Sequence, residues 1–89
     1  MFKVSVIIPI YNAEIYLRKA LESAVILGEV GEVILIEDAS PDNALAVALE
    51  LEQEFEKVKL FQHPDKGNHG AGASRNLGIQ KASCEYIAF

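Results

Sequence analysis

The sequence contains no tryptophan, a single cysteine and fewer basic than acidic residues. Cys84 has no partner for an internal disulfide, and we expect it to be a small buried side chain. The 13 acidic and 8 basic residues give a formal net charge of -5, which argues against a nucleic-acid partner. No apolar run is long enough to span a membrane and no leader pattern is present, so we expect a cytoplasmic location. Membrane attachment through parts of the protein beyond residue 89 stays open.

Neither of the common glycine-rich phosphate-binding motifs, G-x-G-x-x-G and G-x-x-x-x-G-K-[ST], occurs in the chain. Their absence excludes a dinucleotide-binding fold of the usual kind and a P-loop, both of which need glycine to let the backbone approach phosphate. His63 and His69 lack a third ligand at a suitable spacing, so the sequence predicts no metal site.

Short apolar runs alternate with amphipathic segments along the whole chain. Residues 3–10, 32–36, 57–62 and 85–89 are predicted strands. A first helix is expected after Asn12 as its cap, a second with Ser40 as cap and Pro41 at its first position, and a third from about 72 to 81. Strand–helix alternation with short connections predicts an α/β fold, with helices on both faces of a parallel sheet. We predict four strands in the order 3-2-1-4, with the first strand central because it is apolar on both faces.

Open parallel sheets bind ligands beyond the carboxyl ends of their strands, so the segments that follow the strands are the candidate site. In the first of them, Tyr11 offers a flat ring for stacking on a base, beside the polar Asn12 and Glu14. The alternative is that Tyr11 is partly buried and packs on the next helix.

The second strand ends in two neighbouring acidic residues, Glu37 and Asp38. A carboxylate at this position can accept charge-assisted hydrogen bonds from a base N–H or a ribose hydroxyl. The alternative is that Asp38 and Ser40 organise the turn and cap the helix that follows. The acidic pair is not expected to be a general acid/base dyad, because neighbouring residues of a strand point to opposite faces.

The third segment, residues 68–78, is rich in small residues that let the backbone approach a ligand. Gly70 lies near the expected start of a helix, which favours an anion, and Arg75 can offer a fork of donors to a phosphate or a base. Together with His63, Lys66 and His69, Arg75 makes this stretch locally positive. The alternative is a solvated loop.

Taken together, these segments resemble family 2 glycosyltransferases of the GT-A fold. Residues 4–14 are similar to the family's opening strand and its Pro-x-Tyr-Asn turn, residues 33–42 to its acidic motif, residues 68–78 to its third signature, and residues 85–89 to its fourth strand. Glu37 stands where the family usually has aspartate. Ala39 stands where glycine is common, so we expect the turn there to avoid a positive φ.

The resemblance implies that residues 1–89 are the truncated N-terminal nucleotide-sugar-binding part of a glycosyltransferase, the Rossmann-like half of a GT-A fold. It implies that Pro9 and Tyr11 line the nucleobase pocket and that Asp38 hydrogen-bonds the base. The residues expected to bind the nucleotide are Pro9, Tyr11, Asn12, Glu14, Asp38, Ser40, Gly70 and Arg75. The expected donor is a UDP-sugar, and the expected acceptor is a glycan or a lipid-linked molecule in polysaccharide or glycoconjugate synthesis.

In the family, the fourth strand runs into an Asp-x-Asp-type motif that holds a divalent metal, Mn²⁺ or Mg²⁺, on the diphosphate. These 89 residues include neither that motif nor the later catalytic base. We therefore expect no catalytic residue, no bound metal and no activity in this chain alone, and self-association through its exposed fourth strand. The alternative is a non-enzymatic α/β nucleotide-binding or regulatory module. A phospho-acceptor version of it would need an acidic residue where Pro9 and Tyr11 stand.

Overall fold

The apolar runs form a parallel sheet in the computed structural model, which describes residues 3–89. The strands are β1 (Val4–Ile10), β2 (Val30–Glu37), β3 (Val58–Gln62) and β4 (Tyr86–Ala88). Their order is β3-β2-β1-β4, and each neighbouring pair is parallel. The predicted order and the central place of β1 are confirmed.

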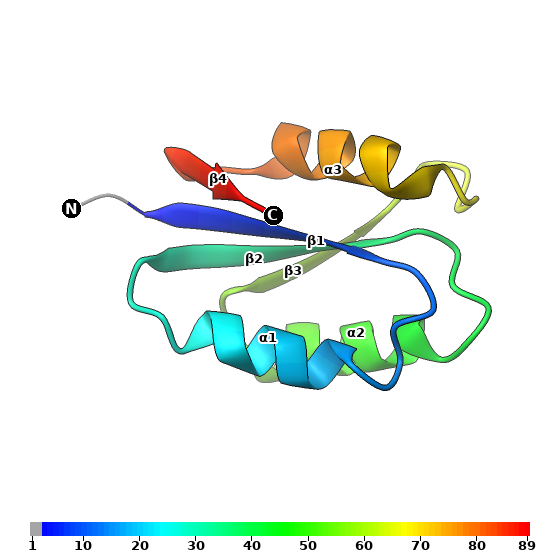
Figure 1. Cartoon of the computed structure of the whole chain (residues 1–89), viewed down its shortest axis with the longest axis horizontal. Helices are drawn as coiled ribbons and strands as arrows, with labels where there is room; N and C mark the ends of the chain where they lie inside the picture. The colour runs from blue at the N-terminus through cyan, green and yellow to red at the C-terminus, as the bar shows by residue number, and fades with distance from the viewer. Residues whose placement is uncertain (1–2) are drawn as a thin grey trace.

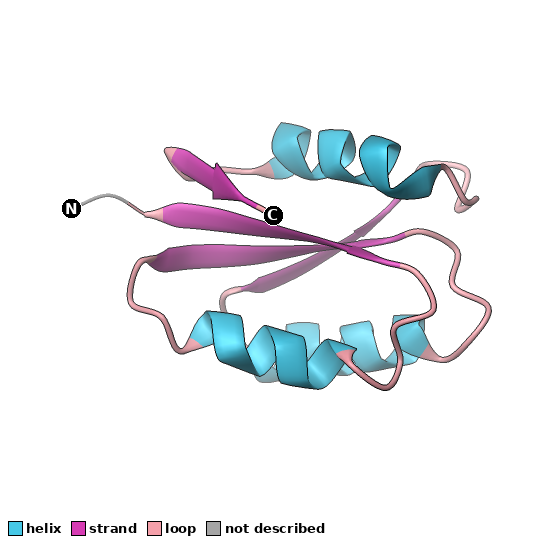
Figure 2. Ribbon diagram, in the orientation of Figure 1, coloured by secondary structure: helices cyan, strands magenta, loops and turns pink. Residues whose placement is uncertain are grey.

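Three helices cover the two faces of this sheet. They are α1 (Leu17–Val25), α2 (Ala44–Glu54) and α3 (Gly70–Lys81). α1 and α2 lie against one face and α3 against the other, which gives the expected three layers (Figures 1 and 2). Among residues 3–89, none of the helices has the length and apolar character needed to cross a bilayer.

Alternate residues of the strands face different helices. Val33 and Leu35 belong to the core that α1 and α2 cover. Ile34 and Ile36 pack with Ile7 in a smaller core on the α3 side. There α3 lies so close to β1 that a Cβ on Gly78 would be 2.4 Å from Cγ2 of Ile7. The largely β-branched side chains of the strands therefore pack on both faces of the sheet, as the continuous apolar runs predicted.

The predicted cap of the first helix is wrong. α1 begins at Leu17, and its N-cap position, Tyr16, makes no side-chain capping hydrogen bond. Asn12 instead has a positive φ of 55° and donates its backbone N–H to Oγ of Ser40 at 3.1 Å. Asn12 tolerates the left-handed conformation better than most residues, so it shapes the turn after β1 and not the helix.

The predicted start of the second helix is also wrong. α2 begins at Ala44, three residues after Pro41. Oδ1 of Asp42 accepts the N–H of Ala44 at 3.0 Å, and Oε1 of Glu14 accepts the N–H of Asn43 at 3.0 Å. The free donors of the helix start are thus satisfied by Asp42 and by a residue from the β1–α1 connection, so Ser40 is not needed there.

Cys84 is half-buried, so the expectation of a buried side chain is wrong. It lies in the connection between α3 and β4 and follows Ser83, which is exposed. Its Sγ occupies space beside Gly31, where a Cβ would lie 2.7 Å from the sulfur. The apolar run around Cys84 belongs to the sheet edge, and this explains the incomplete burial.

Candidate functional site

Asp38 connects the carboxyl end of β2 to the start of α3. Its carboxylate is buried, with Oδ1 accepting the backbone N–H of His69 at 2.7 Å and Oδ2 that of Gly70 at 3.0 Å. Its main-chain oxygen accepts from Nδ2 of Asn68 at 2.9 Å. Asp38 thus satisfies two of the free donors at the start of α3, where the helix dipole also favours a negative charge.

The alternative interpretation is that Asp38 and Ser40 organise the turn and cap the helix that follows. Ser40 does lie in the turn and its Oγ accepts the N–H of Asn12, whereas Asp38 bonds to the start of α3 and not of α2. Glu37 organises the local turn instead: Oε1 accepts the N–H of Ser40, and Oε2 accepts its hydroxyl at 3.1 Å. Asp38 bonds to the α3 side of the sheet while Glu37 holds the turn toward α2, so the two carboxylates diverge. Asp38 is 3% exposed, and its Oδ1 also lies 3.4 Å from Nε2 of His63.

The turn at Ala39 differs from its prediction. Ala39 has a φ of +59°, in the left-handed region that the sequence led us to exclude. Both of its neighbours are fixed: the N–H of Asp38 donates to the Ile10 carbonyl at 2.9 Å, and the N–H of Ser40 donates to Glu37. These contacts over-determine the turn and hold a conformation that alanine adopts with strain.

His63 follows β3 and lies against Asp38. Its Nε2 is 3.0 Å from Oγ of Ser74, on α3, and 3.4 Å from Oδ1 of Asp38. The His63 ring is 4.4 Å from that of His69, whose Nε2 is 2.7 Å from Oδ1 of Asp65. This contact with His69 lowers the pKa of Asp65. Despite the two imidazoles, no group of three His, Cys, Asp or Glu residues in the described part of the chain is placed to hold a metal ion.

Tyr11 directly follows β1, the strand next to β2. Tyr11 is 55% exposed, which leaves part of its surface free for a ligand and part of it covered. Pro9 lies within β1, where it pairs with Ile36 of β2. Asn12 donates its N–H to Ser40, so a hydrogen bond joins the connections that follow β1 and β2.

The remaining predicted residues come from the β1–α1 connection and from α3. Glu14 holds the start of α2 through Asn43. Gly70 has a φ of +89° and begins α3 with its N–H on Asp38. Arg75 is exposed on α3, with its guanidinium carbon 5.9 Å from the centre of the Phe89 ring. The structure thus brings Asp38 and Gly70 together and places Glu14 on the α2 side.

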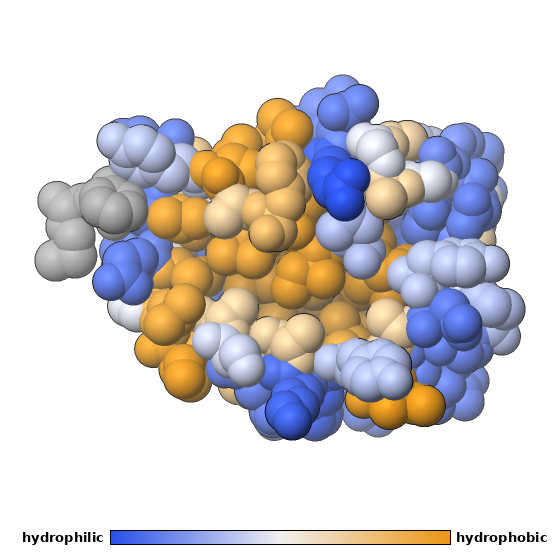
Figure 3. Space-filling model, in the orientation of Figure 1, coloured by the Kyte–Doolittle hydropathy of each residue, from blue (hydrophilic) through white to orange (hydrophobic). Residues whose placement is uncertain are grey.

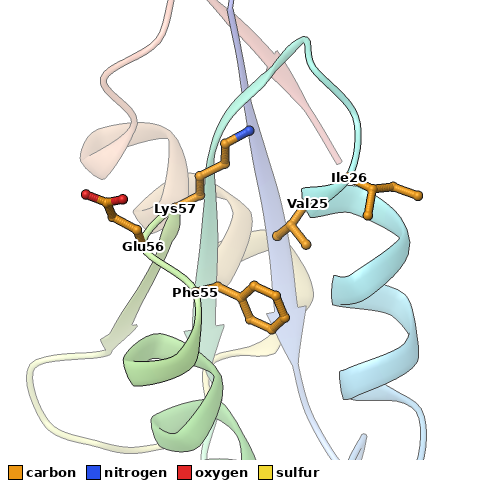
Figure 4. A pocket seen from close by; sticks show the side chains of 5 residues that line it. All are labelled: Val25, Ile26, Phe55, Glu56 and Lys57. Atoms are coloured by element: carbon orange, nitrogen blue, oxygen red, sulfur yellow. The ribbon is translucent and has the colours of Figure 1, made fainter.

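An open hollow of about 370 Å³ lies elsewhere, lined by Val25, Ile26, Phe55, Glu56 and Lys57 (Figure 4). It lies where α1 ends and where α2 leads into β3, at the amino ends of the strands. Nζ of Lys57 is already bonded to the carbonyl of Val30 at 2.8 Å. Because parallel sheets present their ligand sites at the opposite end, we place the candidate site at Tyr11 and Asp38.

Sequence reasoning missed three side chains of this site. Asn68 binds the backbone of Asp38, and His63 with Ser74 lies against its carboxylate. A histidine directly after an apolar strand and a serine inside a helix of small residues were the available signals. Neither signal could say that the two side chains meet, because they belong to different elements.

Comparisons with known proteins agree with this architecture. The family model described as glycosyl transferase family 2 matches residues 5–89. An uncharacterized glycosyltransferase of Haemophilus influenzae is 38% identical over 87 residues, 97% of this chain and 34% of that protein. The minor teichoic acid biosynthesis protein GgaB of Bacillus subtilis is 37% identical over 89 residues, 96% of this chain and 10% of its own length. The chain therefore spans at most about a third of these two relatives.

Solved structures share the fold. S. aureus TarS in complex with UDP has a TM-score of 0.80 and 29% identity, over 96% of this chain and 25% of that one. Mannosyltransferase PcManGT from Pyrobaculum calidifontis, in complex with GDP-Man and Mn²⁺, has a TM-score of 0.83 over 97% of this chain and 26% of that one. At 19% identity, the second likeness shows the fold alone.

Proposed function

The chain belongs to glycosyl transferase family 2, and from this premise we propose that it forms the nucleotide-binding part of an enzyme that uses a UDP-sugar. The enzyme transfers the sugar to a glycan or lipid-linked acceptor, in the synthesis of a cell-envelope polysaccharide or glycoconjugate, at the cytoplasmic side. The observation that carries the proposal is the placement of exposed Tyr11 and buried Asp38 after neighbouring strands β1 and β2. The UDP-bound relative and the teichoic acid protein support the donor and the pathway class.

In this proposal the base is recognised by a ring and a carboxylate. Tyr11 stacks on the base, with Pro9 beside it, because an exposed aromatic face at the sheet edge gives a base a flat apolar contact. Asp38 accepts the N–H of a uracil ring through one of its remaining lone pairs. An ionised carboxylate is acceptor-only, so it favours a base that presents a ring N–H at this position.

The rest of the nucleotide extends from Tyr11 and Asp38 along the loops that follow the strands. Asn12, Glu14 and Ser40 border it on the side of α1 and α2. Gly70 and Arg75 border it on the side of α3, where the helix start and a guanidinium favour a phosphate.

A divalent metal, Mn²⁺ or Mg²⁺, remains our expectation for the whole enzyme. The described residues do not fit it, since no cluster of three His, Cys, Asp or Glu ligands is placed to hold an ion between residues 3 and 89. We therefore derive no transfer step from these residues and expect no sugar transfer by this chain alone.

The proposal predicts weak but base-selective binding of UMP. Because only part of the pocket is present and no metal binds the phosphate, we expect a Kd for UMP on the order of millimolar. NMR titration with UMP and with AMP should shift the Tyr11 and Asp38 signals for UMP only. Asp38→Asn removes the charge but also places an NH₂ against one of the two backbone N–H groups that Asp38 accepts, so circular dichroism is recorded first; in the folded variant UMP binding should weaken by about 1–2 kcal/mol.

The matched control for this test is Asp65→Asn, the same change at an exposed loop carboxylate. It should leave UMP affinity unchanged. Equal responses of the chain to UMP and AMP, or no response to either, would contradict the proposal.

We also propose that the chain self-associates through β4. This strand pairs with β1 through Val4 and Tyr86, Ser5 and Ile87, and Val6 and Ala88. Ile87 is 39% and Phe89 65% exposed, and Figure 3 shows apolar surface in the middle of this face, between α3 and α1. An apolar edge strand is a template for pairing with another chain.

Sedimentation over a range of concentrations tests this association. The chain should become heavier with concentration, and Ile87→Lys should reduce the effect, because a lysine on an edge strand opposes pairing. A monomer at every concentration, in the unmodified chain, would count against the proposal.

A further inference from the structure

We infer that His63 is a positioning residue for Asp38, an inference that rests on the proposed recognition of the base by that carboxylate. His63 and Ser74 together hold the Oδ1 edge of Asp38 in one orientation, so that its remaining lone pairs face the ligand consistently. The pair connects the end of β3 to α3, and neither residue is among those expected to touch the nucleotide.

The first step is the environment of the carboxylate. Asp38 is 3% exposed and accepts one backbone N–H on each oxygen, from His69 and from Gly70. Nε2 of His63 lies 3.4 Å from its Oδ1. Buried polar atoms need hydrogen-bond partners, so the atom that His63 presents to this oxygen matters.

The second step is the tautomer of His63. Its Nε2 is the atom near both Asp38 and Ser74. If Nε2 carried only a lone pair, that lone pair would face the negative Oδ1 and be repelled. An N–H at Nε2 is attracted to Oδ1 and can donate to Oγ of Ser74, so the neutral ring is the Nε2–H tautomer.

The third step is the role of Ser74. It is fully buried on α3, and its Oγ lies 3.0 Å from Nε2 of His63. A fixed partner at this distance sets the orientation of the imidazole plane. Alanine would fit the same space but would leave the ring without this hydrogen bond, so Ser74 and His63 act as one unit.

A spectroscopic experiment tests the contact without any nucleotide. Long-range ¹H–¹⁵N correlation spectra of the chain at alkaline pH, where imidazoles are neutral, should show His63 as the Nε2–H tautomer. Asp38→Asn should shift His63 toward a mixture of tautomers, whereas the matched Asp65→Asn change should alter His69 and leave His63 unchanged. An Nδ1–H tautomer of His63, or one insensitive to Asp38→Asn, would overturn the inference.

A binding experiment tests the consequence for the ligand. His63→Leu should lower UMP affinity about fivefold, the scale of one ordinary hydrogen bond. His63→Gln, whose amide can place an N–H near the same point, should recover most of this loss. Ser74→Ala should lie between them and keeps the test decisive if the leucine variant folds poorly. Val58→Ala, a core change at the other end of β3, should destabilise the fold and leave affinity unchanged.

The two possible failures are distinguishable. If the unmodified chain does not bind UMP, the proposed function fails, while the tautomer of His63 still reports its contact with Asp38. If the chain binds UMP and both His63→Leu and Ser74→Ala bind it as tightly, the positioning role is wrong and the proposed function stands.

Discussion

Two buried carboxylates, Glu32 within β2 and Asp38 directly after it, bond to opposite ends of α3 and differ in their other partners. Asp38, just past the carboxyl end of β2, accepts backbone N–H groups where α3 begins. Glu32, near the amino end, accepts the backbone N–H of Ser83 at 2.6 Å, just after α3 ends. Both residues occupy even positions in an alternating strand, so both lie on the α3 side of the sheet.

The difference lies in what else each carboxylate binds. Glu32 also accepts from Nζ of Lys59 at 2.8 Å and from Oγ of Ser5 at 2.6 Å. Burial alone would raise the pKa of Glu32, but the hydrogen bonds from Lys59, Ser5 and Ser83 outweigh it and hold the pKa at about 2. Asp38 has backbone donors and a histidine in place of a lysine. Glu32 is thus satisfied by a counter-charge, whereas Asp38 has no lysine or arginine among its contacts within residues 3–89, and this is the carboxylate that we propose binds the base.

The largest expected effect is on stability, at Glu32 near the amino end of β2. Glu32→Ala removes the acceptor of three hydrogen bonds and leaves Oγ of Ser5 and the N–H of Ser83 without it. We expect a loss of about 3 kcal/mol in the free energy of unfolding, because two buried donors lose their acceptor. Urea unfolding measures it. The control is Glu50→Ala, which removes an exposed carboxylate 3.6 Å from Arg18 and should cost well under about 1 kcal/mol; equal losses in the two variants would contradict the comparison.

The second expected effect is the pH dependence of stability. The pKa of Glu32 is depressed in the folded chain, from the usual 4.5 to about 2. Its contribution is therefore fully present above pH 4.5 and is lost as the pH falls toward 2. The loss should approach about 3 kcal/mol, and urea unfolding between these pH values should show it. In Glu32→Gln the curve should be flatter over this window; an unchanged slope would assign the acid sensitivity to other groups.

The two ends of β2 also show which features of the fold could be predicted from the sequence. The strand order and the central β1 were predictable, because continuous apolar runs and strand–helix alternation are local signals that few topologies satisfy. The helix starts were not, since the donors of α2 are satisfied by Glu14 from another connection. When a capping residue comes from a distant segment, the sequence around the helix start contains no signal for it.

The candidate site was predictable only in part, for a similar reason. Tyr11 and Asp38 stand out because they follow strands, and the geometry of parallel sheets places such residues at one edge. That Asp38 would be bonded to the start of α3 depends on a contact 32 residues along the chain, to Gly70. Glu32 was also visible as an acid at the start of an apolar run, but its partners belong to three other segments.

The smallest expected effect is at Ala39, beside Asp38. A φ of +59° is strained for alanine by about 1–2 kcal/mol and free of that strain for glycine. Glycine loses more backbone entropy on folding, roughly 0.5–1 kcal/mol, so the two terms oppose each other. Ala39→Gly should therefore raise the free energy of unfolding by about 0.5 kcal/mol, measurable as a small increase in the urea midpoint.

Ala46→Gly, on the exposed face of α2, is the matched control and should lower stability, since its backbone is helical. A loss of stability in both variants would mean that the contacts of Glu37 and Asp38 do not hold Ala39 under strain.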